Sequence, residues 1–92
     1  MGLDTVELLW DVEAAFHIHI SDDEARTLRT VGALNDCIAR LVAERHAAAG
    51  HPTIPAPDVT WPLLVPIVVE CLGVPPDHVR PEAEWARDLG AN

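Results

Sequence analysis

Histidine is the residue type in this chain most suited to metal chemistry, and its spacing does not favour a metal site. His17 and His19 lie two residues apart on a stretch that reads as extended chain, and the other three histidines are scattered. No cysteine or carboxylate cluster joins any of them at the spacing of metal ligands. We therefore expect solvated histidines and no metal site.

Nucleophilic chemistry has equally little support. The only serine is Ser21, and Ser21-Asp22-Asp23-Glu24 is a capping box that already explains it. There is no Gly-x-Ser-x-Gly sequence, phosphate-binding loop or Cys–His pairing. Cys37 and Cys71 sit in apolar helical patterns, and we expect both to be buried, reduced thiols of a cytoplasmic protein. We predict no catalytic residue, and a protein that is not an enzyme.

The pattern that could carry function is a row of carboxylates beside an aromatic residue. Residues 3–16 read as an amphipathic helix whose acidic side holds Asp4, Glu7, Asp11 and Glu13, with Trp10 at its margin. Such a face suits docking on a basic, apolar patch of another protein. The alternative is a solvated helix face with no partner.

The overall charge agrees with a protein partner. Fifteen acidic and six basic residues give a formal charge of −9, which would repel nucleic-acid phosphates. The acidity could also serve only to keep a small domain soluble. The longest apolar run, residues 61–69, contains two prolines and is too short to span a membrane.

Apolar periodicity predicts an all-α domain that positions this face. We expect Thr30 to cap one long helix, Asp58 or Thr60 to cap the next, and Pro66 to kink that second helix or delay its start. The expected helices cover residues 3–16, 22–28, 31–48 and 59–72, with one further turn near 82–88. Residues 50–58 form a proline-rich spacer, which we interpret as a linker within a single domain.

Two segments of the chain resemble acyl carrier proteins. Residues 1–49 contain Leu-Asp-Thr-Val-Glu-Leu, Val-Glu-Ala-Ala-Phe and Ile-Ser-Asp-Asp-Glu-Ala, and are similar to the second half of that family. Residues 59–92 contain Cys-Leu-Gly-Val, Val-Arg-Pro-Glu-Ala and Asp-Leu-Gly-Ala-Asn, and are similar to its first half. Because the halves occur in reversed order, the chain resembles a circular permutant, a four-helix bundle with permuted helix order. The linker 50–58 lies between the two halves.

The resemblance implies an acyl-carrier function, but the chain differs from the family at the position that attaches the cofactor. Family members carry acyl groups on phosphopantetheine, which is attached to the serine of an Asp-Ser-Leu motif. Here Gly2 occupies the serine position, before Leu3, so no cofactor is expected. The resemblance assigns partner contacts to Asp4, Glu7, Trp10 and Glu13.

We therefore expect an acidic interaction module that lacks the arm and docks on the basic surface of a carrier-recognising enzyme or regulator. One alternative is a genuine carrier in fatty-acid or polyketide-type biosynthesis, if a serine precedes Leu3 in the native gene. Another is that the chain is a structural subunit or a domain-swapped dimer. Both a monomer and a domain-swapped dimer are compatible with the resemblance.

Overall fold

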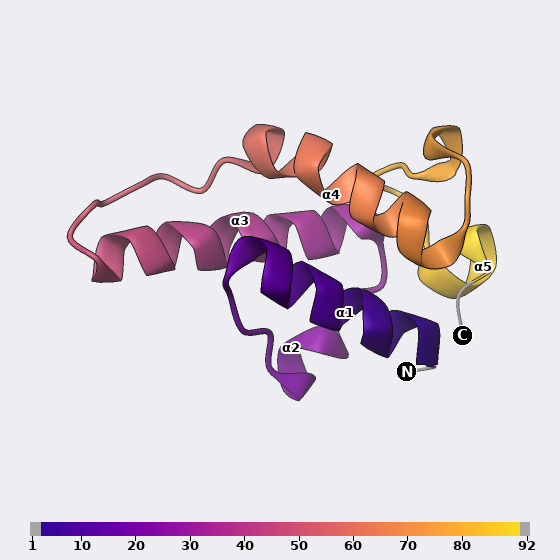
Figure 1. Ribbon diagram of the computed structural model, residues 1–92, viewed down its shortest axis with the longest axis horizontal. Coiled ribbons are helices and arrows are strands. Elements are labelled where there is room, and N and C mark those ends of the chain that lie inside the picture. The colour runs from indigo at the N-terminus through magenta and orange to yellow at the C-terminus, as the bar shows by residue number, and fades with distance from the viewer. Residues whose placement is uncertain (1–2, 91–92) are drawn as a thin grey trace.

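The computed structural model describes the backbone of residues 3–90 and the side chains of residues 5–90. In this part of the chain the regular elements are all helical, as predicted, and Thr30 and Glu84 form an isolated bridge. The elements are α1 (Leu3–Phe16), α2 (Asp22–Ala25), α3 (Val31–Ala48), α4 (Pro57–Leu72), the 3-10 turn η1 (Pro76–His78) and α5 (Trp85–Leu89) (Figure 1). None of the described helices is long and apolar enough to cross a membrane.

The core lies where α1 and α3 pack against α4. Figure 1 shows α4 running in the opposite direction to α1 and α3. The innermost side chains all have relative exposures below 2% and come from these three helices: Leu8, Val12, Val31, Leu34, Ile38, Leu64 and Val68. The alternation of His17–Ile20 predicts an extended loop with Ile18 and Ile20 in the core; Ile20 is buried, and Ile18 is partly buried against the core.

Two of the predicted caps are confirmed. Thr30 Oγ1 accepts a 3.1 Å hydrogen bond from Ala33 N at the start of α3, and Ser21 Oγ accepts from Glu24 N at the start of α2. The predicted length of the helix 22–28 was wrong, because α2 ends at Ala25. After Ala25 the backbone forms hydrogen bonds between residues three apart, and Thr27 N donates to Glu24 O. The Thr27 hydroxyl donates a second hydrogen bond to the same carbonyl oxygen.

The predicted start of α4 was also wrong. Its cap is Ala56, which makes no side-chain capping bond, and Pro57 is the first helical residue. Thr60 is buried and its hydroxyl donates to Asn35 Oδ1 at 2.6 Å, so it fastens α4 to α3. Pro66 does not delay the helix. Both internal prolines are exposed, so water can reach the backbone carbonyls that lose their usual donors.

The tail after α4 is held by the start of α3. Val31 N donates to Ala83 O at 3.0 Å and Gly32 N donates to Pro81 O at 2.8 Å, which satisfies two N–H groups that an α-helix leaves unpaired. The sequence predicts Val79, Ala83, Trp85 and Leu89 as anchors of the tail; Val79, Ala83 and Leu89 are buried, and Trp85 is partly buried against the core. The two sequence segments that flank the spacer are therefore packed into one unit.

Candidate docking surface

The outer face of α1 is acidic and carries an exposed aromatic side chain. Glu7, Trp10 and Asp11 are all exposed, and Trp10 keeps 63% of its accessible surface. They occupy one side of the helix because residues three and four apart are neighbours on a helical surface. Asp4, predicted to belong to this face, has a side chain outside the described residues.

Glu13 has a role inside the chain. Its Oε2 accepts a 2.8 Å hydrogen bond from Ile20 N and lies 3.0 Å from His19 Nδ1, and its side chain is only 23% exposed. This carboxylate holds the loop after α1 in the position that buries Ile20. Glu13 is therefore not part of the exposed face that contains Glu7 and Trp10.

A groove runs between α1 and α4 beside this face. Glu7 and Asp11 line it from α1, and Ile67, Glu70 and Cys71 line it from α4. We call these five residues the acidic groove. Neither helix contains a lysine, arginine or histidine, so no cation on these two helices offsets its three carboxylates. Cys71 was predicted to be buried, but it is only partly covered at this surface.

The outer side of α4 is apolar and exposed. Val59 and Leu63 keep 62% and 57% of their accessible surface, and Pro62 and Pro66 are exposed as well. We call these four residues the α4 stripe. They recur at three- and four-residue intervals and therefore share one helix face, which Glu70 continues toward the acidic groove. Apolar periodicity predicts a covered face that includes Leu64 and Val68, and both are buried, but it does not indicate that other apolar side chains of α4 form an exposed stripe.

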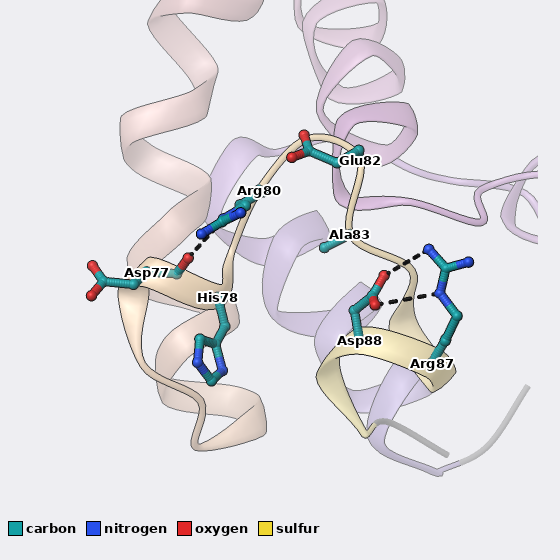
Figure 2. A pocket seen from close by; sticks show the side chains of 7 residues that line it. All are labelled: Asp77, His78, Arg80, Glu82, Ala83, Arg87 and Asp88. Carbon is teal, nitrogen blue, oxygen red and sulfur yellow. Dashed lines mark hydrogen bonds and ion pairs between the residues drawn. The ribbon is translucent and has the colours of Figure 1, made fainter.

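A second hollow lies in the tail and is lined mainly by charged side chains (Figure 2). Arg87 contacts the carboxylates of Glu84 and Asp88, and Arg80 Nε donates to Asp77 O at 3.2 Å. The lining contains two arginines and three carboxylates, so it presents no excess of positive charge to an anion. The lining residues are Asp77, His78, Arg80, Glu82, Ala83, Arg87 and Asp88.

Cys37 is the one buried thiol near ionic groups, and its surroundings make it a poor nucleophile. Its Sγ lies 3.3 Å from Glu24 Oε2, and Arg40 holds the same carboxylate at 2.7 Å. Burial, and then the bond to Glu24, raises the pKa of the Cys37 thiol to about 11. Hydrogen bonds from Cys37 and then Arg40 lower the pKa of Glu24. Among the described residues no group of three or more histidines, cysteines and carboxylates is placed to hold a metal ion.

Phosphopantetheine attachment requires a hydroxyl group near the start of α1. Gly2, at the predicted attachment position, lies outside the described residues and has no side-chain hydroxyl. Thr5 is buried, and Ser21 Oγ is engaged in capping α2. Neither of these two described hydroxyls is therefore an exposed attachment point, and the absence of the group stays a prediction.

The chain matches no known protein-family model, no curated protein and no solved structure.

Proposed function

We propose that this chain is a non-enzymatic, acyl-carrier-like interaction module. It docks through the acidic face of α1 on the basic surface of a carrier-recognising enzyme or regulator. The observation that carries the proposal is Trp10, which is 63% exposed beside the exposed Glu7 and Asp11 on the same side of α1. A large exposed aromatic residue among charges of one sign is typical of a docking surface, since it supplies contact area while the charges steer the partner.

The arrangement of the helices supports the carrier-like part of the proposal. In a permuted carrier, α1, α2 and α3 correspond to the second half of the family and α4 to its first helix. The chain ends must then fall at one end of the bundle. The start of α1 and α5 do lie at the same end of the molecule (Figures 1 and 2). Residues 1–2 and 91–92, which form the proposed junction, are outside the described part.

The module acts without phosphopantetheine in this proposal. Its support is the glycine at position 2 together with the burial of Thr5 and the capping role of Ser21. Recognition would then be retained while the carrier chemistry is lost. Such a protein could occupy the carrier site of an enzyme and block or recruit it.

A phosphopantetheinyl transferase tests both parts, because it recognises carrier proteins and can modify them. We expect the chain to bind the transferase in titration calorimetry, with an affinity that falls as salt is added. We also expect no gain of mass after incubation with coenzyme A. Glu7→Lys should weaken binding more than Glu82→Lys, which makes the same charge change on the tail.

Two results would contradict the proposal. A gain of one phosphopantetheine arm in the intact mass would show a working carrier. Equal weakening by Glu7→Lys and Glu82→Lys would show that only net charge attracts the enzyme, without a defined face on α1.

A further inference from the structure

We propose that the α4 stripe and the acidic groove together bind a cationic amphipathic helix of the partner protein. This inference rests on the proposed function, since it names the segment of the partner that contacts this side of the module. It adds α4, which the sequence resemblance did not include among the contact residues. The inference is based on the exposure of Val59 and Leu63 on α4.

The α4 stripe is built like one half of a helix–helix interface. Val59, Leu63 and Pro66 lie at i, i+4 and i+7, which is the spacing of an apolar stripe that can pack against a second helix. The opposite side of α4, with Leu64 and Val68, is already covered by α1 and α3. A helix laid along α4 would give it apolar neighbours on both sides. An amphipathic helix in an apolar groove is a recurring mode of peptide recognition.

Charge decides which occupant the surface suits. Glu7, Asp11 and Glu70 line the acidic groove, and Asp58 is exposed at the start of α4. Two copies of this chain joined through α4 would bring these carboxylates close together, and like charges at an interface oppose association. A partner helix with lysine or arginine flanking its apolar side would pair with them. The complementary partner is therefore cationic, and a second copy is disfavoured.

The prolines add acceptors to the same side. Pro62 and Pro66 have no N–H, so the carbonyls of Asp58 and Pro62 cannot receive the usual i+4 hydrogen bond. Both prolines are exposed, and in a helix the carbonyl four residues before a proline faces its ring. Lysine and arginine carry donors and no acceptors, so the side chains that pair with the carboxylates can also reach these oxygens.

The test uses the full chain and a synthetic 18-residue helical peptide of leucine and lysine with all leucines on one face. The control peptide has the same composition in shuffled order, without an apolar face. Fluorescence anisotropy of the labelled peptides gives both affinities. We expect the amphipathic peptide to bind at least about tenfold more tightly than the shuffled one.

The decisive variant is Leu63→Glu, with Val59→Glu as a second. Each adds a negative charge, which would strengthen a purely electrostatic association, so a loss of affinity reports the apolar contact. We expect each variant to weaken binding about tenfold, as for an interface hot spot. Ala47→Glu, on the exposed last turn of α3, makes the same charge change elsewhere and should leave the affinity within about twofold. Circular dichroism checks that the variants remain folded, and exposure of both side chains favours this.

Three results would overturn the inference. Equal binding of the shuffled peptide would show that charge alone acts. Unchanged affinity of Leu63→Glu and Val59→Glu would exclude the stripe, while the proposed function would stand if Glu7→Lys still weakened transferase binding. A dimer in sedimentation that Leu63→Glu dissociates would assign the stripe to a second copy.

Discussion

The indole Nε1 of Trp85 donates a 2.9 Å hydrogen bond to the backbone carbonyl of Leu28, 57 positions earlier in the chain. Leu28 follows α2 and Trp85 begins α5, so this bond joins the two segments on either side of the spacer. We expect Trp85→Phe to keep most of the ring packing but lower the free energy of unfolding by about 1 kcal/mol. Urea denaturation measures the change. Trp10→Phe, on an exposed side chain, is the matched control, and an equal loss there would contradict a special role for the bond.

Gly32→Ala should destabilise the protein although glycine is a poor helix former. A Cβ at position 32 would lie 2.7 Å from Pro81 O, the atom that accepts the hydrogen bond from Gly32 N. Relief of the helix-propensity penalty offers about 1 kcal/mol, and displacement of the tail costs about 1–3 kcal/mol, so we expect a net loss. Thermal unfolding followed by circular dichroism measures it. A higher melting temperature than wild type would mean that the tail moves away freely.

Asn35 and Thr60 should behave as a coupled pair. The Thr60 hydroxyl donates to Asn35 Oδ1, and Asn35 Nδ2 donates to Pro57 O at 3.1 Å. Thr60→Val leaves a buried amide oxygen without this donor and should cost about 1–3 kcal/mol. Adding Asn35→Leu should cost less than the sum of the two single changes, because both polar groups are then removed. Strict additivity in chemical denaturation would show that the pair does not act as a unit.

The two thiols should differ in reactivity. With the pKa of Cys37 raised to about 11, only about 0.1% of this group is thiolate at pH 8. Cys71 is partly exposed at the acidic groove. We expect iodoacetamide to alkylate Cys71 well before Cys37 in the folded protein, as followed by peptide mass spectrometry. In urea the two rates should converge, and equal rates without urea would contradict the buried position of Cys37.

Asp88 should make stability depend on pH. Its carboxylate accepts a 2.8 Å hydrogen bond from Glu84 N and contacts Arg87, and these interactions lower the pKa of Asp88 below the usual 3.8. The stabilisation is therefore complete above the unfolded-state pKa and is lost as the pH falls through the lower folded-state pKa. Asp88→Ala should melt at a lower temperature than wild type at pH 7, with a smaller difference at pH 3. A constant difference would contradict this origin, and Asp77→Ala serves as the exposed control.

Much of the fold was predictable from the sequence because its signals are local. The bounds of helices 3–16 and 31–48 and the Thr30 cap all depend on residues within a turn or two of each other. The tail anchors Val79, Ala83, Trp85 and Leu89 were also predictable, since they are apolar residues in a polar stretch, although Trp85 is only partly buried. The exposure of Glu7 and Trp10 follows from the same periodicity on α1.

Contacts between distant segments were decided only by the tertiary structure. Thr60 has the residue type of a helix cap, but its side chain is buried and bonded to Asn35, and α4 already begins at Pro57. Glu13 has the pattern of a free surface carboxylate, yet it binds the loop at Ile20. Along α4 the apolar periodicity predicted the covered face with Leu64 and Val68, but because nearly every side is apolar, it did not predict which apolar side chains stay exposed. The packing of α1 and α3 selects Leu64 and Val68 for the core and leaves Val59 and Leu63 exposed.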